Sequence, residues 1–132
     1  MTEPVPPVSQ FKSRGGISRI VCAIRYSVAG LGAALRNEHA FRQEVMLFGI
    51  ATVAALILPL DALHRLLLVG VLALVLITEL MNSAIEAVVD RVSLDTHPLS
   101  KTAKDFGSAA VFLAMLLAAA TWMVVLWPLV TG

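Results

Sequence analysis

Four polar side chains share one face of an otherwise apolar stretch, TELMNSAIEAVVDR (residues 78–91). Glu79, Asn82, Glu86 and Asp90 recur at steps of three and four residues, which places them together on one side of a helix. A charged side chain inside a membrane helix costs at least ~2.5 kcal/mol, and residues kept at that cost usually serve a function. The stretch therefore predicts a functional acidic site at the end of a membrane span.

Two kinds of chemistry fit these side chains. Carboxylates can bind Mg²⁺ through their oxygens, and one of them can accept a proton from a reacting hydroxyl. Lys104 and Asp105 open the next apolar segment after a short connection, so they can lie near Glu86 and Asp90. A lysine beside metal-binding acids suits a nucleotide phosphate. Because the chain has no Walker A sequence, the residues alone point to an acidic Mg²⁺ and phosphate site built in another way.

The composition places this site in a membrane protein. The 132 residues are 58% hydrophobic and 14% charged, with a mean hydropathy of +0.86. Soluble domains average about 25% charged residues. Cys22 is the single cysteine, which excludes a disulfide framework. Basic residues are not interleaved with aromatic ones, so a nucleic-acid partner is not expected.

The elements that must position the site are helical. One apolar stripe with arginines beside it predicts an amphipathic helix at the membrane surface, although docking on protein would give the same pattern. Three apolar runs follow, and Trp122 and Trp127 near the end fit an interfacial aromatic belt. We predict an all-α membrane protein with an N-terminal amphipathic surface helix plus three transmembrane helices. The expected parts are a disordered tail over 1–16 and a single domain over 17–132, with the surface helix over 17–44 and spans over 45–60, 64–91 and 102–128.

Charge sets the expected orientation. Six of the ten basic residues precede the first span, three lie in 91–104, one lies in the 61–65 turn and none lies at the C-terminal end. By the positive-inside rule the N-terminus and the 92–101 connection face the cytoplasm and the C-terminus lies outside. In the last span, Ala110, Ala114 and Ala118 form a small-residue stripe that would allow close helix packing.

Four sequence motifs together resemble the signature of the small bacterial diacylglycerol kinases. The resemblance covers roughly residues 17–130, and the order of its elements matches one surface helix followed by three spans. The motifs are RNEHAFRQE (36–44), NSAIEAVVDR (82–91), HPLS (97–100) and AKDFGSAAV (103–111).

The resemblance implies an ATP-dependent, Mg²⁺-dependent lipid kinase of the inner membrane that converts 1,2-diacylglycerol to phosphatidic acid in phospholipid recycling. It implies a homotrimer with active sites between subunits. Glu79 would be the general base, and Glu38 and Glu86 would bind the metal. The nucleotide site would add Arg19, Tyr26, Asp95, His97, Lys104 and Asp105 to these two acids. Lipid-binding positions would be Arg19, Ala40, Phe41, Arg42, Gln43, Glu44, Arg65 and Ser108, with Asn82 and Asp90 supporting the polar face.

Some departures leave alternatives open. The surface helix has Val28, Ala29 and Gly32 where well-known members carry a bulky, basic stretch. Pro98 in the HPLS motif is similar to relatives that phosphorylate undecaprenol. The segments 40–44 and 103–111 instead resemble the diacylglycerol branch, and we favour diacylglycerol as the substrate. An ion-conducting helical assembly would also explain the acidic face, but not Lys104 and Asp105. A scaffold assembled through the alanine stripe would leave the acids unexplained.

Overall fold

Every element of the described chain is an α-helix. The computed structural model describes residues 16–92 and 97–131. Its helices are α1 (Gly16–Asn37), α2 (His39–Ile57), α3 (Ala62–Val92) and α4 (Pro98–Thr131). All four are long and apolar enough to cross a membrane, which confirms the predicted all-α membrane class. The predicted tail lies almost wholly outside the described residues. The chain divides into two units, Met1–Ala33 and Ala34–Gly132, and the second contains α2, α3 and α4.

A break at Glu38 divides the region that the sequence predicted as one helix over 17–44. Glu38 has an extended backbone, with φ −100° and ψ 115°. Helix ends leave backbone carbonyls without partners. Here the Arg42 guanidinium covers two of them, because its Nη1 donates to the carbonyls of Arg36 at 2.9 Å and Leu35 at 3.4 Å. Arg42 therefore caps α1 from within α2. The location of α1 at the membrane surface stays a prediction.

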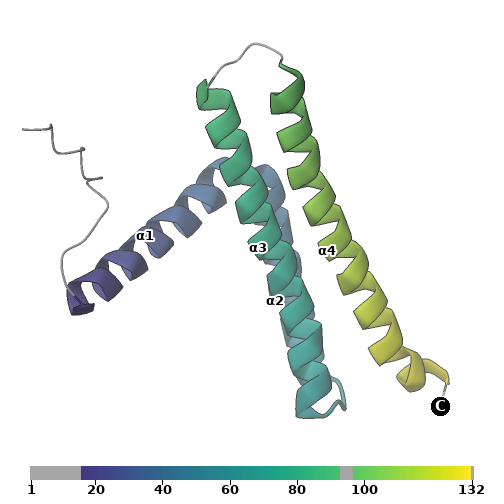
Figure 1. Ribbon diagram of the computed structural model, residues 1–132. Helices are drawn as coiled ribbons and strands as arrows, with labels where there is room; N and C mark the ends of the chain where they lie inside the picture. The colour runs from purple at the N-terminus through teal and green to yellow at the C-terminus, as the bar shows by residue number, and fades with distance from the viewer. Residues whose placement is uncertain (1–15, 93–96, 132) are drawn as a thin grey trace, which may run out of the picture. The chain divides into compact units, whose positions relative to one another are not determined.

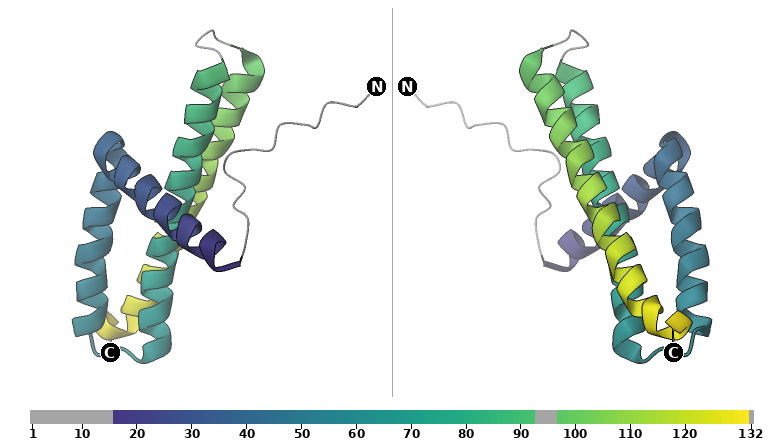
Figure 2. Two further views of the ribbon diagram at one scale, coloured as in Figure 1. Left: turned by 90° about the vertical axis from the view of Figure 1, so that its left-hand side faces the viewer. Right: turned by 90° about the vertical axis from the view of Figure 1, so that its right-hand side faces the viewer.

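In the second unit, α3 is the central helix and contacts both α2 and α4. Figure 1 shows α3 and α4 running side by side in opposite directions, and both views of Figure 2 agree. At 31 residues, α3 is about 46 Å long. The hydrocarbon core of a bilayer is about 30 Å thick. A spanning α3 therefore has turns to spare, and the polar residues 79–90 lie in its C-terminal half.

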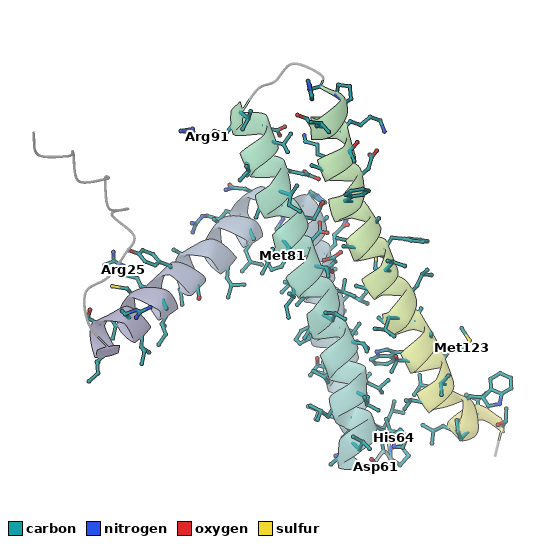
Figure 3. The ribbon with its side chains drawn as sticks, viewed as in Figure 1. Arg25, Asp61, His64, Met81, Arg91 and Met123 are labelled. Atoms are coloured by element: carbon teal, nitrogen blue, oxygen red, sulfur yellow. The ribbon has the colours of Figure 1, made fainter. Side chains whose placement is uncertain are left out.

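Asp61 and Arg65 shape the turn between α2 and α3. Asp61 precedes the first residue of α3 and its Oδ1 accepts the backbone N–H of His64 at 3.0 Å, a standard N-cap. Arg65 Nη2 donates to the carbonyl of Leu58 at 3.2 Å, at the end of α2. Figure 3 shows Asp61 and His64 together at the opposite end of α3 from Arg91. This turn therefore lies at the far end of α3 from the polar face.

Packing between the helices is limited to a narrow apolar seam. One cluster joins Ala55, Leu68 and Val125, and a second joins Val75, Ala114 and Ala118. Two alanines of the predicted small-residue stripe thus lie buried against α3, where small side chains let helices approach. Most large apolar side chains elsewhere are exposed, as in Ile50 and Phe112. A surface of this kind suits lipid or further protein rather than water.

Candidate active site

Glu79 is the buried acid of the site. It is 9% exposed and is the one charged side chain classed as buried among the described residues. Its carboxylate interacts electrostatically with those of Glu38, Glu44 and Glu86. The polar face of α3 therefore interacts with two acids from the beginning of α2, Glu38 and Glu44.

Glu44 contributes to this cluster from α2. Its Oε2 is buried without a hydrogen-bond partner. The same side chain lines a cavity of ≈ 150 Å³ between α2, α3 and α4, whose other walls are apolar and include Phe48, Leu72 and Met115. The residue thus places one carboxylate at the edge of an apolar space, and this carboxylate interacts electrostatically with that of Glu79. The resemblance assigned Glu44 to the lipid, and this location is compatible with an apolar ligand.

Asn82 holds Glu86 in place one turn away. Its Nδ2 donates to Glu86 Oε1 at 3.1 Å. A carboxylate only accepts hydrogen bonds, so this contact fixes which end of the amide faces Glu86. Asn82 Oδ1 then points elsewhere, and it is buried without a hydrogen-bond partner. It lies against Gly107 of α4, where a side chain of any size would overlap it.

Lys104 brings a positive charge to the same face. Its Nζ donates to Asp90 Oδ1 at 2.6 Å across the two helices, and it interacts electrostatically with Glu86. Lys101 and Asp105 form a second ion pair of 2.6 Å along α4. One end of α3 and α4 thus combines several carboxylates with an ammonium group, an arrangement that can bind a metal and a phosphate.

The carboxylates of this site can be compared with what a divalent cation requires. Within residues 16–92 and 97–131, no three His, Cys, Asp or Glu side chains are grouped to hold a metal ion. Mg²⁺ does not need such a cage, because it is commonly held by one or two carboxylates together with water and substrate phosphates. Glu38 and Glu86 both interact with Glu79, and each offers hard oxygen ligands. These two residues fit a Mg²⁺ ion that arrives with nucleotide.

Other predicted site residues have the following places. Arg19 and Tyr26 lie on α1, in the first unit, where Arg25 packs over the Tyr26 ring at 5.9 Å. His97 precedes α4 and its Nδ1 accepts the backbone N–H of Leu99 at 3.2 Å, so it caps that helix. Ala40, Gln43 and Ser108 are exposed, and Phe41 is almost fully buried. Asp95 lies outside the described residues.

Arg65 and Arg42 are predicted to bind lipid, but in the structure they donate hydrogen bonds to backbone carbonyls at helix ends. Arg65 belongs to the turn at the far end of α3 and bonds a carbonyl of α2, so the structure does not bring it to Glu79. Arg42 caps α1 near Glu38. Gly107 was absent from the predicted site, although a glycine inside a helix is a signal for close packing. The sequence could have suggested Gly107, but it could not have identified Asn82 as its neighbour.

The fold and the site define a class of protein: an integral membrane protein of α-helices with a carboxylate and lysine site at one end of its spans. Residues 25–126 match the prokaryotic diacylglycerol kinase family, and the chain belongs to that family.

Several curated relatives agree. A diacylglycerol kinase of Pseudomonas aeruginosa is 51% identical over 118 residues, covering 89% of this chain and 96% of the relative. The diacylglycerol kinase of Escherichia coli K12 is 51% identical over 112 residues, covering 85% and 92%. That of Haemophilus influenzae is 38% identical over 107 residues, covering 81% and 91%. The similarity therefore extends over nearly the whole length of each relative.

Proposed function

We propose that this chain is a diacylglycerol kinase that transfers the γ-phosphoryl group of ATP to the hydroxyl of 1,2-diacylglycerol and yields phosphatidic acid. The observation that carries the proposal is Glu79, a buried carboxylate that interacts with other acids, one of which, Glu86, also interacts with Lys104 of α4. The curated relatives named above are all diacylglycerol kinases. An ion pathway or a scaffold explains neither this match nor the Lys104 ammonium beside the acids.

Each residue has a defined task in this proposal. The Glu79 carboxylate accepts the proton of the lipid hydroxyl as that oxygen attacks phosphorus. Lys104 neutralises phosphate charge, and Asn82 orients Glu86 through the 3.1 Å hydrogen bond. Glu38 and Glu86 would hold Mg²⁺, which would offset the negative charge of the transferring phosphoryl group. The family resemblance also assigns Arg19, Tyr26, Asp95, His97 and Asp105 to nucleotide binding.

The lipid reaches Glu79 from the bilayer side. Glu79 is the first acid after the apolar run of α3, and Glu44 beside it borders the apolar cavity. An acyl chain suits those walls, while its hydroxyl end meets the carboxylates. We also propose a homotrimer, as the family resemblance implies, and the exposed apolar side chains of α2 and α4 are available for contact with other subunits as well as with lipid.

Phosphorylation by the purified protein tests the function. The assay supplies ATP and Mg²⁺ in mixed micelles with diacylglycerol or, separately, undecaprenol, and it measures both lipid phosphates. We expect phosphatidic acid as the main product. Glu79→Gln should lower kcat by roughly 10²–10⁴-fold, the usual contribution of a general base, while nucleotide binding is retained. A wild-type protein that is folded but makes neither product would instead favour the ion pathway.

The orientation can be tested separately. We propose that the N-terminus and the 92–101 connection are cytoplasmic and that the C-terminus is external, because nine of ten basic residues lie on the first side. A single cysteine at position 93, in a Cys22→Ser background, should be labelled only after the membrane is permeabilised. Labelling of intact cells by a membrane-impermeant maleimide would reverse the assignment.

A further inference from the structure

Gly107 of α4 packs closely against Asn82 of α3, beside the acidic face. It is buried, and its Cα faces Asn82 of α3. A Cβ built at this position would overlap Asn82 Oδ1 and approach Asn82 Cγ to 3.2 Å. The same Cβ would be 3.6 Å from Asn82 Cα, which is ordinary van der Waals contact. A methyl group at 107 is therefore excluded by the amide group of Asn82 and not by the backbone of α3.

The amide that occupies this space is the one that orients Glu86. Asn82 Nδ2 donates to Glu86 Oε1 at 3.1 Å, while its Oδ1 fits into the space above Gly107 without a hydrogen-bond partner. Moving Oδ1 away from Gly107 requires rotation of the amide about the side-chain torsions, and that rotation moves Nδ2 as well. The absence of a side chain at Gly107 thus leaves the space that the Asn82 rotamer bonded to Glu86 occupies.

We propose that Gly107 is a positioning residue for the kinase reaction: it keeps Asn82 in the conformation that holds Glu86 ready for Mg²⁺-nucleotide. The proposal rests on the function proposed above. Gly107 touches neither substrate nor metal, and it acts through Asn82. A glycine in a helix interior destabilises the helix relative to alanine, so its presence at this buried position calls for a reason, which the Asn82 contact supplies.

Gly107→Ala is the direct test, with Gly70→Ala as the matched control. Gly70 also lies inside a helix, and a Cβ there would meet nothing within 4 Å. Binding of Mn²⁺ with a non-hydrolysable ATP analogue, followed by electron paramagnetic resonance, reports the metal site without turnover. We expect Gly107→Ala to weaken this binding roughly tenfold, the value of one hydrogen bond to a charged group, and to raise the Mg²⁺ concentration for half-maximal activity by a similar factor. Gly70→Ala should bind like the wild type.

A second background separates positioning from packing. In an Asn82→Ala protein the amide is gone, so adding Gly107→Ala should cause no further loss of Mn²⁺-nucleotide binding. An additional loss in that background, wild-type binding by Gly107→Ala, or failure of Gly107→Ala to fold would each overturn the proposal, because the 3.6 Å clearance predicts a folded variant. The wild-type phosphorylation assay tests the proposed function independently, since the binding comparison needs no lipid turnover.

Discussion

Lys104 Nζ lies 2.6 Å from Asp90 Oδ1, and this ion pair joins the second turn of α4 to the last turns of α3. Both side chains are partly exposed, at 39% and 52%. Exposed ion pairs contribute little to stability. The pair therefore matters for where it holds the ammonium group, which is on the same side as Glu86.

Lys104→Met should weaken ATP binding without unfolding the protein. The lost charge-assisted contact predicts a rise in the KM for ATP of roughly tenfold or more, and Asp90→Asn should raise it by less, because the lysine remains. The melting temperature should change little for either variant. Arg91→Met is the control, since it removes one positive charge from the same end of α3. An equal effect of Arg91→Met would show that the general field, and not the position of Lys104, governs binding.

Glu44→Gln should make the protein more stable and less active. In the wild type a buried Glu44 oxygen has no hydrogen-bond partner, and the carboxylate repels that of Glu79. Glutamine keeps the shape and removes the charge, so thermal unfolding without Mg²⁺ or ATP should occur at a higher temperature. Active-site residues often lower the stability of a fold because function requires them. A lower unfolding temperature, or an unchanged kcat, would contradict this account.

Much of the site could be predicted because its residues follow one another on a helix. The spacing of Glu79, Asn82, Glu86 and Asp90 already placed them on one face. Lys104 could be added because only a short connection separates it from that face. The contribution of α2 was different: Glu38 and Glu44 came from the family resemblance, and only the packing of α2 against α3 brings their charges near Glu79.

The all-α class of the fold could be predicted, but the helix break and the close contacts between helices could not. Apolar runs show where helices lie, whereas a helix break depends on local contacts that periodicity does not contain. Glu38 interrupts a stretch that the apolar stripe left continuous, and a capping arginine four residues later covers the freed carbonyls. Gly107 is similar: its effect depends on the side chain across the helix interface, which no pattern along one chain specifies.

We predict that Asp61, at the α2–α3 turn, makes the stability of the fold depend on pH. Hydrogen bonds from the backbone and side chain of His64 hold the pKa of Asp61 below its ordinary value of 3.8. A carboxyl whose pKa is lower in the folded state stabilises the fold above its unfolded pKa, and this contribution is lost as the pH falls through the folded pKa. Unfolding measured from pH 7 down to pH 3 should therefore show a stability loss confined to the acid end.

Two substitutions separate the charge of Asp61 from its capping. Asparagine is also a good N-cap, so Asp61→Asn should keep most stability at neutral pH while removing this part of the acid dependence. Asp61→Ala should lower stability at every pH, because the N-cap is lost as well. Identical pH profiles for the wild type and Asp61→Asn would show that other carboxyls cause the acid loss.

We predict that a substitution at Trp122 lowers the stability of the protein without changing its catalysis. Sequence placed Trp122 and Trp127 in an interfacial belt, but the Trp122 ring N–H donates to the Leu68 carbonyl of α3 at 3.2 Å, beside the cluster of Ala55, Leu68 and Val125. Trp122→Phe keeps an aromatic ring and loses this bond between helices, so unfolding should become easier by about 0.5–1.5 kcal/mol. The KM for ATP should not change, because Trp122 lies toward the opposite end of α4 from Lys104.

Trp127→Phe is the matched control for that measurement. Trp127 is on the same helix, and its side chain is 64% exposed, so the same substitution should cost much less. The two variants would be compared by denaturant unfolding in mixed micelles, with kinase activity measured on the same samples. Equal destabilisation by both would assign the effect to the membrane interface, and a raised KM for ATP in Trp122→Phe would mean that the seam between α3 and α4 transmits strain to the acidic site.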